Sequence, residues 1–229
     1  AEFGFERYTL SYEELLADEQ IDAVAIYTPD QLHGQHVRQA LEAGKHVICT
    51  KPLIPALDEA RALIAAAQQT DRHVFVGQST RFFEPFIHQR RDFEAGRYGR
   101  LHTVEATYHT DGRWFLERGW SRRSGFSWLF GFLSHAADLI RWYLPDIADV
   151  MGYGWTANPE SNEPDTLHFV LRSTSGAVAR CSGSFVSPGL PHARHSQITC
   201  IVRGEQGSGC AEYSNLIYTA QFDRPEIHD

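Results

Sequence analysis

The sequence has 229 residues, a hydrophobic fraction of 42% and a charged fraction of 22%, which is ordinary for a globular protein of one large or two modest domains. Its net charge of -8 argues against a nucleic-acid partner, and no apolar run approaches the ~18 residues of a membrane span. The N-terminus lacks the features of a signal peptide, and the four cysteines form no CxxC pair. We therefore expect a cytoplasmic protein with reduced thiols, no zinc site and no membrane contact.

The first part of the chain alternates short apolar runs with segments of helical spacing. Continuous apolar runs suit strands buried on both faces, and Gly44 supplies the end of the first long helix. Such an order predicts right-handed βαβ units and a parallel sheet. The strands are expected at residues 22–27, 46–49 and 73–77, and the helices at residues 33–43 and 57–69.

A doubly wound nucleotide-binding domain normally opens with a strand, a glycine-rich turn and a helix, and this sequence has no GxGxxG. The nearest string, Gly204 to Gly209, has the wrong spacing and lies among predicted antiparallel strands. We therefore expect residues 1–80 to form a partial Rossmann-type domain, in a chain that is either truncated or printed without some of its residues.

After about residue 80 the pattern changes to longer strands, several of which alternate apolar and polar residues. This alternation predicts a mostly antiparallel sheet with one solvated face, in an α+β domain over residues 81–229. The strands are expected at residues 100–110, 150–156, 167–173, 177–185 and 197–203, with one strong helix at residues 134–144.

Two polar segments follow neighbouring predicted strands, and one of them contains a lysine. Thr28-Pro29 follows the first strand, and Thr50-Lys51-Pro52 follows the second. Parallel strands end at the same edge of a sheet, where open α/β folds bind ligands. Partial burial there would lower the pKa of Lys51 and help it exchange a proton. The alternative interpretation is an ordinary surface lysine.

Four segments carry a family resemblance. TPDQLHGQHVRQALEAGKHVICTKPL closely resembles the segment that identifies the Gfo/Idh/MocA oxidoreductases. VGQSTRFFEPF is similar to the stretch at the family's domain junction, His135 to Asp138 resembles its HxxD helix start, and VRGEQGSG resembles a late strand and turn. The four matches occur in the family's order over nearly the whole chain.

The resemblance implies an NAD(P)-binding Rossmann domain and a second domain with a large open sheet that often forms the oligomer interface. It implies NAD or NADP as the cofactor, a sugar, inositol or related polyol as the substrate, and a homodimer or homotetramer as the assembly. It further implies that Lys51 and His135 are catalytic. We expect cofactor contacts from Thr28, Pro29, His33, Thr50, Lys51 and Gln78, and substrate contacts from Lys51, Trp120, Arg122 and His135.

The sequence departs from the family pattern at two positions that usually carry carboxylates. Thr50 replaces the glutamate before the lysine, and Gly131 stands four residues before His135, where many members have a catalytic aspartate. Asp111 and Glu105 are the candidate substitutes. The two losses also favour an alternative function, a cofactor-binding sensor without turnover.

Other candidates have weaker support. The pairs His33/His36 and His192/His195 have metal-compatible spacing, but no carboxylate or thiol accompanies them at zinc spacing, so we expect no metal site. Asp138 can orient His135 or serve a structural role, and we favour the structural one. The aromatic and basic loop that contains Trp114 and Arg122-Arg123 is an equal candidate for substrate contact or for packing.

Overall fold

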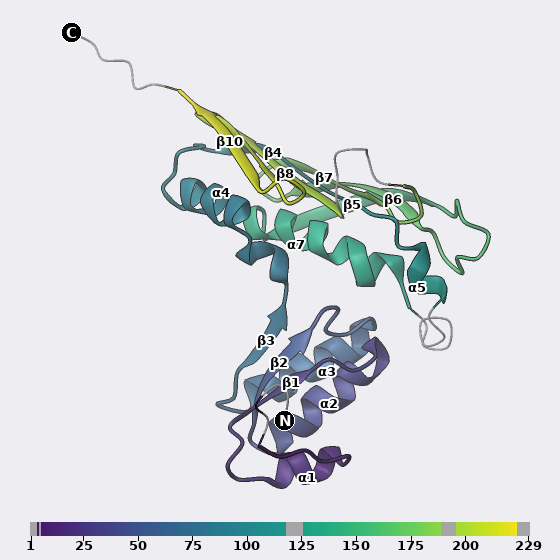
Figure 1. Ribbon diagram of the computed structural model, residues 1–229. Coiled ribbons are helices and arrows are strands. Elements are labelled where there is room, and N and C mark those ends of the chain that lie inside the picture. Colours follow the sequence, from purple (N-terminus) through teal and green to yellow (C-terminus); the bar gives the residue numbers. More distant parts are fainter. Residues whose placement is uncertain (1–3, 5, 118–125, 189–195, 224–229) are drawn as a thin grey trace. The chain divides into compact units, whose positions relative to one another are not determined.

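The structure is a computed structural model that describes residues 4, 6–117, 126–188 and 196–223. Its contacts divide the chain into two compact units, Ala1–Gly77 and Gln78–Asp229, which are coloured purple to blue and blue to yellow in Figure 1. Among the described residues, no helix combines the length and the apolar character needed to cross a bilayer.

The first unit contains a parallel sheet with the strand order β1-β2-β3. Its register pairs Ile26 with Cys49 and Thr50 with Gly77, so all three strands end at one edge. This confirms the predicted partial Rossmann-type sheet. The strands are β1 (Ala23–Ile26), β2 (His46–Thr50) and β3 (Val74–Gly77).

Three helices belong to this unit, and the second begins earlier than predicted. It starts at Asp30 rather than at His33, because Pro29 at its N-cap has a φ of -58°, which suits a helix start. Val37, Ala40 and Leu41 of this helix are buried against the apolar side chains of β1 and β2. The helices are α1 (Tyr12–Ala17), α2 (Asp30–Glu42) and α3 (Leu57–Gln68).

The second unit is built on a seven-stranded sheet with the order β10-β9-β8-β4-β7-β6-β5. Its neighbouring strands are antiparallel except for β4 and β7, which are parallel, so the predicted mostly antiparallel sheet is confirmed. The strands are β4 (Leu101–His109), β5 (Ile147–Trp155), β6 (Thr166–Ser173), β7 (Val178–Ser184), β8 (Gln197–Gly204), β9 (Gly207–Glu212) and β10 (Ile217–Phe222).

Sequence patterns missed β9 and β10. The sequence of β9, GSGCAE, has low strand propensity, and its place in the sheet depends on pairing with β8. At Gly209 a side chain would collide with the Tyr98 hydroxyl and crowd Tyr218, so this strand uses glycine where other groups approach closely. Tertiary packing therefore outweighs local propensity here.

Helices cover one face of this sheet, as Figure 1 shows for α4 and α7. Helix α7 packs on β4, β7 and β8, and its Leu139 and Ile140 are fully buried. No described helix covers the opposite face. The helical segments are η1 (Ser79–Phe82), α4 (Glu84–Glu94), α5 (Arg113–Glu117), the π-helix η2 (Leu129–Leu133) and α7 (Ser134–Tyr143).

A buried glutamine links this helical layer to the sheet. Gln89 of α4 has no exposed surface, and its Nε2 donates to the carbonyls of Cys200 (2.9 Å) and Gly209 (3.1 Å). Its Oε1 accepts a hydrogen bond of 3.0 Å from the Tyr143 hydroxyl. One amide side chain thus forms hydrogen bonds with a carbonyl of β8, a carbonyl of β9 and a hydroxyl of α7, all of which are buried.

We expect Gln89→Leu to lower the free energy of unfolding of the second unit by about 2–4 kcal/mol, because two carbonyls and a hydroxyl lose a buried partner. Denaturant titration followed by circular dichroism measures this change. Gln221→Leu, at an exposed position of β10, is the control and should change stability little. Equal stabilities of the two variants would contradict this role of Gln89.

Candidate active site

The polar segments that follow β1 and β2 lie at one edge of the parallel sheet. Thr28 and Pro29 separate β1 from α2, Thr50 is the last residue of β2, and Lys51 follows it directly. The register that pairs Ile26 with Cys49 brings the two segments to the same end of adjacent strands. In open α/β sheets this end is where ligands bind.

The His33 side chain connects these two segments. Its Nδ1 lies 2.7 Å from the Pro52 carbonyl oxygen, and its Nε2 lies 2.8 Å from the Thr28 carbonyl oxygen. The ring has no exposed surface. The expected cofactor contact of His33 stays a prediction; in the structure both of its nitrogens face backbone carbonyls, which positions the segment that carries Lys51.

The same contacts bear on the metal pair considered from the sequence. Both nitrogens of His33 face carbonyl oxygens, which leaves neither for a metal ion. The Nδ1 of His36 lies 3.1 Å from the Thr28 hydroxyl, and the Tyr12 hydroxyl donates to the His36 carbonyl. These histidines therefore stabilise the turn between β1 and α2.

Lys51 lies in a partly buried environment that contains a carboxylate. Burial of the ammonium lowers the pKa of Lys51 below its ordinary value, and the negative charge of Asp30 opposes this shift. Burial likewise raises the pKa of the Asp30 carboxyl, against the charges of His33 and Lys51. A lysine with a lowered pKa is suited to proton exchange.

In the second unit, His135 is the second residue of α7 and is 7% exposed. Its Nδ1 lies 3.0 Å from the Thr80 hydroxyl, and its ring packs at 5.7 Å from that of Tyr108. Thr80 belongs to η1, so a hydroxyl from the segment after residue 78 sets the orientation of the imidazole. Sequence analysis did not single out Thr80, although it lies in the quoted segment VGQSTRFFEPF.

Asp138 has a partner other than His135. The two carboxylate oxygens of Asp138 each accept a hydrogen bond of 2.6 Å from the Arg81 guanidinium. This bidentate pair joins η1 to α7 and supports the structural role that we favoured for Asp138. The guanidinium also lies over the Trp142 ring, at 5.1 Å from its centroid.

Gly131, at the position of the missing aspartate, lies in the π-helix η2 just before α7. A Cβ there would approach the Phe126 ring to 2.5 Å. The aromatic ring of Phe126 therefore occupies the space that a side chain at residue 131 would need. The packing at the helix start therefore leaves no room for a carboxylate at this position.

The two other candidate carboxylates are already paired with arginines. Glu105 lies on the sheet face opposite to Val104 and Ala106, which are buried beneath α7, so it points away from His135. Its carboxylate pairs with Arg203 and with Arg180. Glu105 is therefore no substitute for the aspartate missing before His135.

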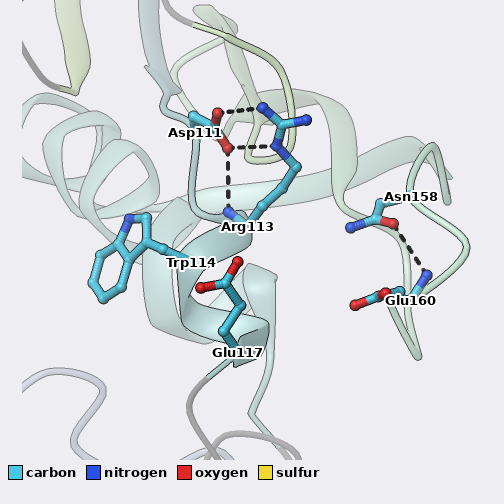
Figure 2. A pocket seen from close by; sticks show the side chains of 6 residues that line it. All are labelled: Asp111, Arg113, Trp114, Glu117, Asn158 and Glu160. Atoms are coloured by element: carbon cyan, nitrogen blue, oxygen red, sulfur yellow. Dashed lines mark hydrogen bonds and ion pairs between the residues drawn. The ribbon is translucent and has the colours of Figure 1, made fainter.

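Asp111 lines a hollow of about 540 Å³, together with the other residues that Figure 2 labels. Both of its oxygens accept hydrogen bonds from the Arg113 guanidinium, at 2.8 and 2.5 Å. Figure 2 shows the Trp114 indole turned away from this pair. The hollow combines carboxylates, an amide and an indole, from residues Asp111, Arg113, Trp114, Glu117, Asn158 and Glu160.

Two buried side-chain oxygens, one on the residue directly before η1 and one on the residue directly before His135, have no partner among the described residues. These are the Oε1 of Gln78 and the Oγ of Ser134. Because buried polar atoms nearly always have partners, such atoms are candidates for ligand contacts. Gln78 is one of the expected cofactor-binding residues, and its contact with the cofactor stays a prediction.

Several predicted positions are not covered by these observations. The expected substrate contacts Trp120 and Arg122, the neighbouring Arg123, and the pair His192/His195 lie outside the described residues. The string from Gly204 to Gly209, discounted as a phosphate cradle, spans the turn between β8 and β9. Its position in an antiparallel hairpin supports that judgement.

Residues 1–78 match a family profile described as "Oxidoreductase family, NAD-binding Rossmann fold", and residues 86–209 match the "GFO/IDH/MocA C-terminal domain". The second match alone covers more than half of the chain. The chain belongs to the Gfo/Idh/MocA family. The resemblance noted from the sequence motifs is thereby confirmed.

Similar proteins include sugar oxidoreductases. A 1,5-anhydro-D-fructose reductase from Ensifer adhaerens is 30% identical over 196 residues, which are 81% of this chain and 57% of the relative. A levoglucosan dehydrogenase from Pseudarthrobacter phenanthrenivorans is 27% identical over 242 aligned residues, with 90% of this chain and 59% of the relative covered.

A solved levoglucosan dehydrogenase in complex with NADH and levoglucosan superposes with a TM-score of 0.87 at 26% identity. The superposition covers 96% of this chain and 62% of that protein. The chain thus spans about three fifths of the length of each of these three relatives.

We expect Gly131→Asp to lower the free energy of unfolding of the second unit by about 1–3 kcal/mol, because the new side chain collides with the Phe126 ring. Thermal unfolding of the purified variant measures the loss. In the double variant Gly131→Asp/Phe126→Ala the collision is removed, so the loss should be smaller than the sum of the two single losses. Strictly additive losses would argue against this packing.

Proposed function

We propose that the protein is an NAD-dependent oxidoreductase that transfers a hydride between the nicotinamide and a hydroxyl-bearing carbon of a sugar or related polyol. The observation that carries this proposal is the partly buried lysine, with a lowered pKa, at the ligand-binding edge of a Gfo/Idh/MocA parallel sheet. The named functions of the similar proteins, a sugar reductase and a sugar dehydrogenase, support the substrate class.

The residues at the sheet edge fit a nicotinamide cofactor. Thr28, Pro29 and Thr50 would line it at the ends of β1 and β2, and the orphaned Oε1 of Gln78 would accept a hydrogen bond from it. NAD is the form named in several solved relatives, including the complex with NADH and levoglucosan. When bound, the cofactor supplies the hydride acceptor, and the protein supplies binding and orientation.

Oxidation of an alcohol requires that its hydroxyl proton leave as the hydride departs. We assign this proton transfer to Lys51 and His135. The lowered pKa of Lys51 allows the side chain to alternate between ammonium and amine. The Thr80 hydroxyl at Nδ1 of His135 orients the imidazole so that it can accept or relay the proton.

The hollow beside Asp111 supports a polyhydroxylated substrate. Carboxylate and amide groups bind the hydroxyls of a sugar. Glu117, Asn158 and Glu160 line this hollow together with Asp111. We propose that this hollow contributes to sugar recognition.

A second candidate function is cofactor sensing without turnover. The observation in its favour is the absence of the two usual carboxylates, at Thr50 and Gly131. A sensor would bind NAD tightly and leave the NADH absorbance unchanged across a broad panel of sugars and polyols. Turnover of any member of that panel excludes it.

We expect Lys51→Ala in the full-length protein to lower kcat by about 100-fold or more, because the proton-transfer group is removed. The rate of NADH formation with a responsive sugar measures the loss. Arg61→Ala, which removes a cationic side chain that is 72% exposed on α3, should leave the rate unchanged. A Lys51→Ala enzyme with the wild-type turnover rate would remove Lys51 from the mechanism.

We also propose that the uncovered face of the seven-stranded sheet joins copies of this chain into a homodimer or homotetramer. Met151 and Val170 are cross-strand partners on this face and are 65% and 48% exposed. Tyr153 and Trp155 follow on the same side of β5, at 79% and 71% exposure. Exposed apolar side chains grouped in this way are typical of protein interfaces.

We expect the double variant Met151→Asp/Val170→Asp to be monomeric, because two carboxylates would be buried at the interface. Light scattering coupled to size-exclusion chromatography measures the mass of the wild type and of the variant. Leu57→Asp, at an exposed apolar position of α3, is the control and should retain the wild-type mass. An unchanged mass of the double variant would place the interface elsewhere.

A further inference from the structure

The loop between β5 and β6 forms one wall of the hollow that Asp111 lines. This loop spans residues 156–165, and its Asn158 and Glu160 are among the residues that surround the hollow. The other wall comes from residues 111–117, which include α5. Because the two walls belong to distant parts of the sequence, tertiary contacts must hold them in place.

The main chain of Phe185 connects the two walls. Its N–H donates to the Asp165 carbonyl at 3.0 Å, and its carbonyl accepts a hydrogen bond of 2.7 Å from the Gly112 N–H. The Phe185 ring has no exposed surface and lies 5.9 Å from that of Tyr108, which lies 5.7 Å from that of His135. Both walls are thereby attached to the aromatic cluster that contacts the imidazole of His135.

A buried carboxylate holds the start of the loop. Asp165 has no exposed surface, and its two carboxylate oxygens accept hydrogen bonds of 2.9 Å from the N–H groups of Ala157 and Asn158. The Asp165 N–H donates to the Trp155 carbonyl at 3.2 Å, so the two ends of the loop are joined. Burying a carboxylate is unfavourable unless hydrogen bonds replace the lost water, and here Asn158 and its neighbour supply them. The carboxylate therefore fixes the backbone at the point where the Asn158 side chain begins.

The side chain of Asn158 is fixed through its oxygen. The Oδ1 accepts a hydrogen bond of 3.1 Å from the Glu160 N–H, and the Asn158 carbonyl accepts one of 2.9 Å from the Ser161 N–H. Because the amide oxygen is bound to the loop itself, the amide nitrogen with its two donors points the other way. Figure 2 shows this nitrogen turned toward the wall that contains Arg113 and Glu117.

We infer that Asn158 is a specificity-determining residue whose Nδ2 donates a hydrogen bond to an oxygen of the sugar, and that Asp165 is the positioning residue that holds it there. The carboxylates of the hollow accept hydrogen bonds, and its guanidinium is already paired with Asp111. The amide of Asn158 adds a donor to this set, so a sugar with an oxygen at the matching position is favoured over one without it. The inference deepens the proposed function and rests on it.

The first test compares a sugar with its deoxy forms in the full-length protein. The probe is whichever of D-glucose, D-galactose, D-xylose and myo-inositol gives the fastest NADH formation, together with its monodeoxy analogues. We expect Asn158→Asp to raise KM about 3–10-fold with little change in kcat, because a hydrogen bond made in both the ground state and the transition state is lost. One monodeoxy analogue should be disfavoured by the wild type and no longer disfavoured by the variant.

The choice of variants separates the donor from the loop. Asn158→Asp keeps an oxygen for the Glu160 N–H and replaces the donor, and Asn158→Ala removes the donor without adding a charge. The matched control is Asn162→Asp, the same change at an exposed asparagine of the same loop, which should leave KM and the deoxy pattern unchanged.

Asp165→Asn tests the positioning role, because it places an amide nitrogen opposite one of the two backbone N–H groups. We expect a similar rise in KM, and little further rise when the change is made in the Asn158→Asp background, because both changes act on one contact. A purely structural role would lower thermal stability and leave KM unchanged. If Asp165→Asn does not fold, Asp165→Ser, which keeps one acceptor oxygen, takes its place.

The outcomes distinguish this inference from the proposed function. Wild-type turnover, with an unchanged KM and an unchanged deoxy pattern in Asn158→Asp, overturns the inference and leaves the proposed function standing. If the wild type turns over none of the four probes, the proposed function fails for them, and the ¹⁵N-labelled protein is titrated with each probe in the presence of NADH. A shift of the Asn158 side-chain amide signal, with that of Asn162 in place, then supports the inference. An unmoved Asn158 signal overturns it.

Discussion

The contact of one imidazole with two backbone carbonyls holds the polar edge of the first unit together. The ring of His33 joins the end of β1, through the Thr28 carbonyl, to the segment after β2, through the Pro52 carbonyl. A parallel sheet brings these two segments to the same edge but does not by itself fix the conformation of either. The bridge does so from within the buried side of α2.

In the second unit, side chains of η1 hold the histidine of α7 in place. Thr80 contacts the imidazole of His135, and Arg81 pairs with Asp138 one turn later in α7. Gln89 then links the next helix to the sheet and to Tyr143 at the other end of α7. Both ends of this helix are thus held by polar contacts that are buried or partly buried, so the imidazole is presented on a rigid element.

The chain differs from its family in where it carries negative charge. The two usual carboxylates are absent, and the structure accounts for each absence in a different way. At Gly131 the Phe126 ring fills the space that a side chain would need, so an apolar ring stands where the carboxylate would lie. At Thr50 the candidate substitutes Asp111 and Glu105 are paired with arginines, and the negative charge that acts on Lys51 is that of Asp30. The chemistry of a lysine depends on the charge near it and not on the sequence position that supplies it.

The amino-acid sequence by itself determined the parallel strands of the first unit, the mostly antiparallel sheet of the second and the place of Lys51 at a strand end. These features depend on hydrophobic spacing and on proline and glycine, which act over a few residues. Only the tertiary structure decided that His33 bridges carbonyls, that Thr80 contacts His135 across 55 positions and that Arg81 reaches Asp138 across 57. The hairpin strands β9 and β10 likewise depend on pairing with β8 and on each other. The role of a polar side chain depends on the partner that folding brings within hydrogen-bonding distance. When that partner lies far along the chain, local sequence patterns cannot predict it.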